Sequence, residues 1–150
     1  MKTLKGTSLY YKARAVFGNA NISITDSEYA SPSEKWITGK FYHNFNWWMQ
    51  SNGVKKWKTY TDCDNKAFAY FVCANISHAK TMEARARASM KTYEGIAVGV
   101  MFYLIGGKKT AGHAINVVYT NGKLVYIEPQ NGEQLKLTKK EIDSCWYVTF

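Results

Sequence analysis

Cysteine, proline and long apolar runs are all scarce in this sequence. Its 3 cysteines are an odd number, which excludes a framework in which every cysteine forms a disulfide, and a reducing compartment fits best. No apolar run is long enough to cross a bilayer, and the first residues lack the apolar core of a signal peptide, so we expect a cytoplasmic protein with no membrane partner. With 46% hydrophobic and 21% charged residues the composition is globular, and we expect one domain over residues 1–150.

Acidic residues are also few, with 11 Asp and Glu against 20 Lys and Arg and a net charge of +9. Residues 1–60 hold nine basic and three acidic residues, a net +6, and the remainder holds eleven and eight, a net +3. A basic half favours an anionic partner, and Lys55, Lys56 and Lys58 around Trp57 have the composition of a surface on which nucleic acid stacks. A solvated basic loop with one anchoring tryptophan explains the same run, because no nucleic-acid motif accompanies it.

The first half of the chain is predicted to be helical. Ser31, Pro32 and Glu34 form a helix start with a capping box, so a long helix is expected from there to Gly53. A shorter helix is expected over Leu9–Phe17. These segments would make residues 1–55 a helical N-terminal lobe.

A second long helix is expected to begin at Thr61 or Asp62. The run AFAYFVCA that follows Lys66 is apolar on nearly every side, which is typical of a helix buried in the middle of a domain. A third helix is expected from Thr81 to Thr92, where strong helix formers cluster.

The rest of the chain reads as antiparallel strands. The apolar run over residues 96–105 predicts one strand, and Asn121-Gly122 between two β-rich runs predicts a hairpin with a two-residue turn. LKL and the terminal CWYVTF predict two more strands, with a capping box in TKKE between them. Helices followed by antiparallel strands indicate an α+β fold, in which residues 56–150 form a central helix packed on an antiparallel sheet.

The hairpin turn also predicts which residues face one another. If Thr120 pairs with Lys123, side-chain alternation places His113 and Glu128 on one face of the sheet as diagonal neighbours, close enough to touch. Asn116 points to the opposite face and is a poor partner for His113.

Cys63 lies between Asp62 and Asp64 at the start of the second long helix. The unpaired N–H groups and the positive end of the helix dipole favour a thiolate there, whereas the two acids oppose it. Together with His113 and Glu128 it makes a cysteine, a base and an orienting acid in chain order, the arrangement of an activated thiol nucleophile.

DCDNKAFAYFVCAN and HAINVVYTNGKLVYIEP, within residues 60–131, resemble the active-site helix and the His–acid hairpin of transglutaminase-like, papain-like cysteine enzymes. The resemblance implies a papain-like domain with Cys63 as nucleophile, His113 as general base and Glu128 as orienting acid. Glu128 stands where the family usually has Asp, and Gln130, opposite His113, could orient the imidazole instead. Trp57 or Gln50 could donate to an oxyanion, together with the N–H of Cys63.

The predicted function is thiol-dependent acyl transfer on a peptide or amide substrate, first as a cysteine peptidase or amidohydrolase. A crosslinking transglutaminase is a further alternative. A different class stays open, namely a non-catalytic binding module of the same fold that holds an anionic partner or ligand on its basic aromatic surface. An inhibitor or decoy that captures a ligand without turnover is the remaining possibility. No spacing of Cys and His suits a metal site, and no cofactor is expected.

Overall fold

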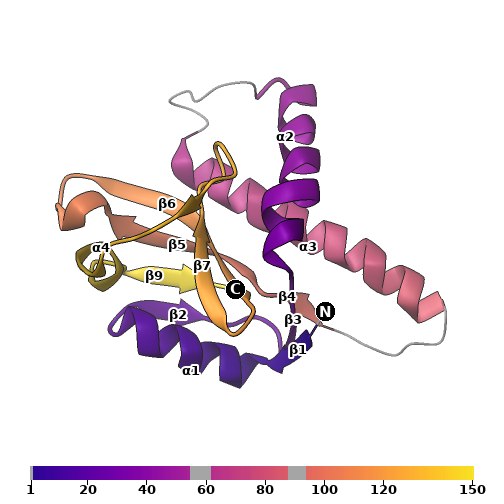
Figure 1. Ribbon diagram of the computed structural model, residues 1–150, viewed down its shortest axis with the longest axis horizontal. Coiled ribbons are helices and arrows are strands. Elements are labelled where there is room, and N and C mark those ends of the chain that lie inside the picture. The colour runs from indigo at the N-terminus through magenta and orange to yellow at the C-terminus, as the bar shows by residue number, and fades with distance from the viewer. Residues whose placement is uncertain (1, 55–61, 88–93) are drawn as a thin grey trace.

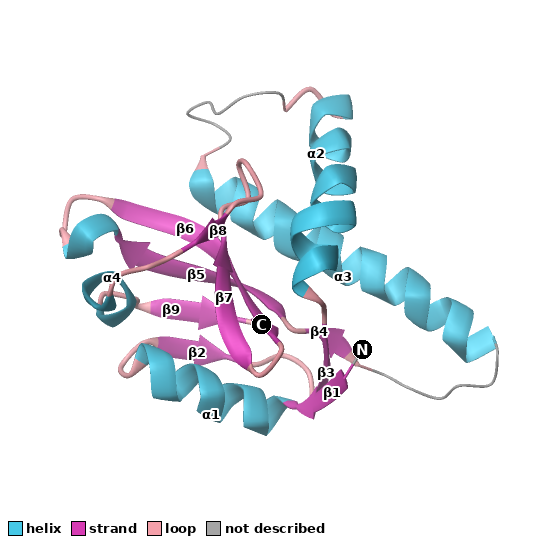
Figure 2. Ribbon diagram, in the orientation of Figure 1, coloured by secondary structure: helices cyan, strands magenta, loops and turns pink. Residues whose placement is uncertain are grey.

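The computed structural model describes residues 2–54, 62–87 and 94–150, with the backbone alone described over 82–87. Two sheets and two helical layers make up this part of the chain (Figure 1). A six-stranded sheet lies between helix α1 on one side and helices α2 and α3 on the other (Figure 2).

The N-terminal region is not the helical lobe that the sequence predicts. Only α1, Gly6–Phe17, matches the expected first helix, and it is surrounded by three strands, which are β1 (Lys2–Lys5), β2 (Asn21–Ser23) and β3 (Glu28–Ser31). Ser31 does not cap a helix, because it pairs with Lys2 in the β1–β3 ladder. Ser33 takes the capping position instead, and its Oγ accepts a hydrogen bond from the N–H of Trp36 at 3.2 Å.

The helices also differ from the prediction in their bounds. The segment after Ser33 contains a π-helical turn, η1 (Trp36–Lys40), which leads into α2 (Phe41–Ser51). The expected second and third long helices are one helix, α3, Cys63–Arg87. No glycine or proline interrupts this stretch, so no residue within it ends the helix.

The large sheet has the order β2-β9-β5-β6-β7-β8, and the small sheet has the order β1-β3-β4. The remaining elements are β4 (Gly95–Ile96), β5 (Val98–Leu104), η2 (Ile105–Gly107), β6 (Gly112–Thr120), β7 (Lys123–Ile127), β8 (Gln134–Leu135), α4 (Lys139–Asp143) and β9 (Tyr147–Thr149). Each sheet includes a parallel pair, β2–β9 in the large one and β3–β4 in the small one. The expected α+β fold on one antiparallel sheet is therefore corrected to a mixed α/β fold with two mixed sheets.

The β6–β7 hairpin has the predicted register. Thr120 pairs with Lys123, and the two turn residues, Asn121 and Gly122, have φ angles of 49° and 86°. Positive φ at both positions is what a type I′ turn requires, and Asn-Gly accepts it at low cost. The turn and the alternation of side chains together determine which face each hairpin residue occupies.

The large sheet buries side chains on both faces. Met101, Ile115 and Val117 pack toward α1. The opposite face, toward α2 and α3, carries Val98 and Val100 of β5 and Ala114 and Val118 of β6. Asn116 is fully buried on the α3 side, where its Nδ2 donates to the main-chain oxygens of Ala67 on α3 and Gly99 on β5, both at 2.9 Å. This amide ties the long helix to the centre of the sheet.

Candidate functional site

His113 and Glu128 touch, as the hairpin register predicts. His113 Nε2 lies 2.8 Å from Glu128 Oε2, and the two side chains are only 16% and 13% exposed. The other carboxylate oxygen, Oε1, accepts a hydrogen bond from the N–H of Gln130 at 3.1 Å, so Glu128 is held from two directions. Little water reaches this pair, which strengthens the charge-assisted hydrogen bond between imidazole and carboxylate.

The main chain of Gln130 makes contacts on both sides, and the orienting role of its amide stays a prediction. Its main-chain oxygen accepts a hydrogen bond from the Tyr42 hydroxyl at 3.1 Å, which links the end of β7 to α2. Burial, and then the charge of Glu128, raises the pKa of that tyrosine, so the hydroxyl stays a donor. Within the described part of the chain, no hydrogen bond joins the Gln130 amide to His113.

Cys63 is half-buried in the first turn of α3 and packs beside Ala67, Val100 and Ala114. His113 pairs with Tyr103 of β5, so its imidazole lies on the face of the sheet that carries the Tyr103 ring. Among the residues that the structure describes, no hydrogen bond joins the thiol to His113.

Tyr103 lies between the two groups. Its ring meets the His113 ring edge to face at 5.8 Å, and its pKa is raised to about 12 by burial and then by the charges of Glu141, Glu128 and Cys63. Tyr103 is therefore close to both His113 and Cys63. The catalytic roles assigned to the three residues stay predictions.

The predicted oxyanion donors and basic residues are only partly covered by the described residues. Gln50 is exposed in the last turn of α2. Trp57, Lys55, Lys56 and Lys58 lie outside the described residues, so the predicted oxyanion donor and basic run stay predictions.

The acids beside the thiol interact with each other. A hydrogen bond with Asp64, with burial and the charge of that residue as smaller causes, raises the pKa of Asp62. Among the described residues, no three metal-ligating side chains lie in one cluster. No helix in this part of the chain is long and apolar enough to cross a membrane.

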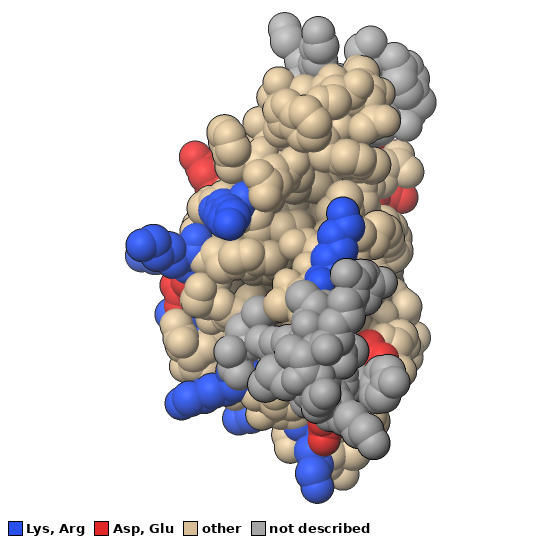
Figure 3. Space-filling model, turned by 90° about the vertical axis from the view of Figure 1, so that its right-hand side faces the viewer, with Lys and Arg blue, Asp and Glu red and all other residues tan. Residues whose placement is uncertain are grey.

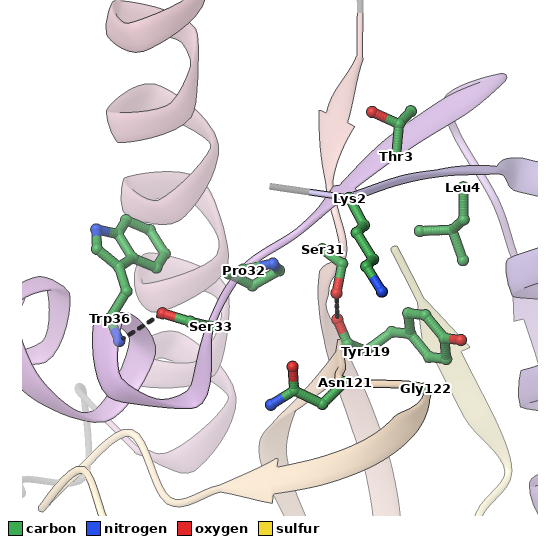
Figure 4. A pocket seen from close by; sticks show the side chains of 10 residues that line it. All are labelled: Lys2, Thr3, Leu4, Ser31, Pro32, Ser33, Trp36, Tyr119, Asn121 and Gly122. Carbon is green, nitrogen blue, oxygen red and sulfur yellow. Dashed lines mark hydrogen bonds between the residues drawn. The ribbon is translucent and has the colours of Figure 1, made fainter.

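A second site opens where the small sheet meets the β6–β7 turn (Figure 4). We call it the hairpin pocket. Its volume is about 860 Å³, and it is lined by Lys2, Thr3, Leu4, Ser31, Pro32, Ser33, Trp36, Tyr119, Asn121 and Gly122. The sequence analysis did not identify it, because Asn121-Gly122 indicated a turn and Trp36 indicated a helix, with nothing to bring them beside β1.

The walls of the hairpin pocket are held rigidly. The Trp36 ring stacks on Phe41 with the centroids 4.7 Å apart and the planes 26° apart. The Ser31 hydroxyl donates to the main-chain oxygen of Tyr119 at 3.0 Å, which fastens β3 to the end of β6 (Figure 4). These contacts leave one indole surface in a fixed orientation at the pocket wall.

Two polar groups in the hairpin pocket remain available to a ligand. The side chains of Lys2 and Asn121 are exposed, and within the described residues neither makes a hydrogen bond or ion pair. By contrast, Lys123 on the outer side of the turn is 3.2 Å from Glu34 and is already paired. The pocket thus combines one free cation, one free amide and one aromatic wall.

Comparison with known proteins gives matches at the level of structure alone. No protein-family model and no curated protein matches the chain. A solved structure described as a PSL1a-E64 complex matches with a TM-score of 0.74 and 16% identity, over 99% of this chain and 51% of that one. The structure of Polyporus squamosus lectin bound to the human-type influenza-binding epitope Neu5Acα2-6Galβ1-4GlcNAc matches with a TM-score of 0.71 and 16% identity, over 99% and 49%.

These matches correct the functional expectations. The structural neighbours, which include a lectin, correct the assignment to transglutaminase-like, papain-like cysteine enzymes. The predicted peptidase, amidohydrolase and crosslinking activities gain no support from these matches, which at 16% identity show a shared fold alone. A peptide or amide substrate is likewise unsupported. The chain spans about half the length of the solved structures that it matches, 51% and 49%, and it shares its fold with structures of a lectin.

Proposed function

We propose that this chain is a non-catalytic carbohydrate-binding module, and that the hairpin pocket holds an acidic glycan. The observation that carries the proposal is the placement of a free Lys2 ammonium, a free Asn121 amide and the fixed Trp36 ring around one cavity. It develops the binding-module alternative of the sequence analysis, with a basic and aromatic surface as the recognition element.

The chemistry of a sugar suits these three groups. A sugar ring presents an apolar C–H face that packs against an indole, and its hydroxyls need both donors and acceptors, which a carboxamide supplies. A sugar that also carries a carboxylate needs a cation, and Lys2 is the free cation among the described lining residues. Few convergent polar groups on a mostly preformed wall are typical of small-ligand sites.

Two further observations support the proposal. One structural neighbour is a lectin bound to Neu5Acα2-6Galβ1-4GlcNAc, a glycan with an acidic sugar at its end. The first 60 residues of this chain, which supply Lys2 and Trp36, carry a net +6. A positive field of this kind draws anionic ligands toward the surface.

The test is calorimetric titration of the chain with Neu5Acα2-6Galβ1-4GlcNAc and with the same glycan lacking its acidic sugar. We expect a dissociation constant below about 1 mM for the acidic glycan and weaker binding for the neutral one. Lys2→Gln should weaken binding of the acidic glycan about tenfold and that of the neutral glycan little, since the lost interaction is charge-assisted.

Two more variants complete the titration. Asn121→Gly removes the amide and retains a residue suited to the positive φ of the turn, so binding should fall without loss of the fold. Lys109→Gln is the matched control, because it removes the same charge from an exposed loop outside the pocket. The proposal fails if neither glycan binds at millimolar concentration, or if Lys2→Gln and Lys109→Gln have equal effects.

A further inference from the structure

A second cavity, separate from the hairpin pocket, runs between α2 and α3. We call it the helical groove. Its volume is about 550 Å³, and it is lined by Phe41, Asn44, Phe45, Trp47, Trp48, Ala69, Val72, Cys73, Ile76, Ser77 and Lys80. The proposed sugar site does not use this surface.

The helical groove exposes large apolar side chains that a monomer would normally bury. Trp47 is 67% exposed, Trp48 44%, Val72 48% and Ile76 51%. Single exposed apolar residues are ordinary, but a contiguous group of this kind marks an interaction site. The floor beneath them is firmly packed, because Phe41 and Phe45 are buried against Tyr70 of α3.

The lining residues follow helical spacing on both walls. On α3 the groove takes positions 69, 72, 73, 76, 77 and 80, and on α2 it takes 41, 44, 45, 47 and 48. Steps of three and four place each set along one stripe of its helix. Figure 1 shows α2 crossing α3, so the two apolar stripes meet in a groove at the crossing, and an amphipathic helix can lay its apolar face against such a surface.

The charges around the helical groove indicate which charge a partner helix should carry. The α2 sequence and residues 65–81 of α3 contain no acidic residue, whereas Lys80 lines the groove and Lys40 immediately precedes α2. Figure 3 shows this side of the molecule, where uncharged residues fill the upper part and several Lys and Arg side chains stand out below it. A second copy of this chain, with its net +9, would bring like charges together.

We propose that the helical groove docks an acidic amphipathic helix of another protein. The apolar face of that helix covers Trp48, Val72 and Ile76, and its carboxylates lie beside Lys80. The site is independent of the sugar pocket, so it stands or falls separately from the proposed function.

The experiment titrates the intact chain with a synthetic amphipathic helix of about 18 residues, Leu and Ile on one face and Glu on the rest. The control peptide keeps the apolar face and replaces every Glu by Lys. Fluorescence anisotropy of the labelled peptide gives the affinity, and the indole N–H signals of Trp47 and Trp48 in NMR spectra report where it binds. We expect the acidic peptide to bind and to shift both indole signals, and the basic peptide to bind at least about tenfold more weakly.

Four variants locate the interaction. Ile76→Glu places a charge in the apolar contact and should weaken binding at least about tenfold, whereas Ile105→Glu, at a similarly exposed site outside the groove, should have no effect. Lys80→Glu should weaken binding about threefold or more, and Lys109→Glu, on an exposed loop, should have a smaller effect. Ile76 is 51% exposed and Ile105 47%, so both variants are expected to fold.

Three results would overturn the proposal. Absence of binding is one, and equal binding of the two peptides is another, since it would remove the charge argument. The third is self-association in sedimentation that Ile76→Glu abolishes, which would make a second copy the occupant.

Discussion

The three thiols are expected to react with iodoacetamide at widely different rates, in the order Cys63, Cys73, Cys145. Cys145 is 6% exposed, and burial raises its pKa to about 11 from an ordinary value of 9.0, an effect that hydrogen bonds only partly offset. With its pKa near 11 and not 9.0, the Cys145 thiol forms about a hundredfold less thiolate near neutral pH. The thiolate is the species that reacts with iodoacetamide. Burial also raises the pKa of Cys73. Cys63 is half-buried at the open first turn of α3.

The assay is peptide-resolved mass spectrometry of alkylation at pH 7.5, on the folded chain and on the same chain in urea. Unfolding exposes all three thiols to solvent, so their alkylation rates in urea should converge. These rates serve as the internal reference. In the folded chain Cys145 should be protected at least about a hundredfold relative to urea, with steric exclusion adding to the ionisation effect. The rate at Cys145 should rise with pH until about 11. If Cys145 reacts as fast as Cys63 in the folded chain, the reasoning from burial is wrong.

The same assay tests the predicted role of His113. If the imidazole acts on the thiol, His113→Ala slows alkylation of Cys63 and leaves Cys73 and Cys145 unchanged. Glu128→Gln should give a smaller effect in the same direction, because Glu128 holds the imidazole through the 2.8 Å contact. Rates at Cys63 that agree within about twofold between wild type and His113→Ala would show that the two groups act independently.

Three further predictions concern stability, measured by urea unfolding. Asn116→Ala should cost about 2–4 kcal/mol, because it removes both hydrogen bonds to buried carbonyls on α3 and β5; a change below about 0.5 kcal/mol would contradict this. Gly99→Ala should destabilise by about 1–3 kcal/mol, because a Cβ there would meet the main-chain oxygen of Thr149 on the neighbouring strand. Thr138→Ala should cost about 1 kcal/mol by breaking the capping box with Glu141, and Thr138→Ser should restore most of it.

Local signals in the sequence predicted the parts of the structure that depend on near neighbours. The Asn121-Gly122 turn and the pairing of Thr120 with Lys123 were readable because a two-residue turn and a period of two leave one register. The Thr138 capping box was readable because both partners lie within four residues. The contact between His113 and Glu128 followed from the same register.

The same kind of signal was misleading where a distant strand competed. The helix-start pattern at Ser31 was predicted to cap a helix, but Ser31 pairs with Lys2, and the cap moved to Ser33. The strand β2 pairs with β9 at the other end of the chain, and no local pattern indicates such a partner. Both cases show a long-range ladder overriding a local preference, because a strand is stabilised by the partner it pairs with.

The sequence by itself determined the hairpin, its register, the α4 cap and the shared face of His113 and Glu128, because each depends on residues a few positions apart. Only the tertiary structure decided that the two expected helices are one helix over the described residues, Cys63–Arg87. Tertiary packing also assembled the hairpin pocket, from residues 2–4, 31–36 and 119–122. Segments this far apart meet only when the sheets close around the buried core, so no pattern within any one of them could indicate the site.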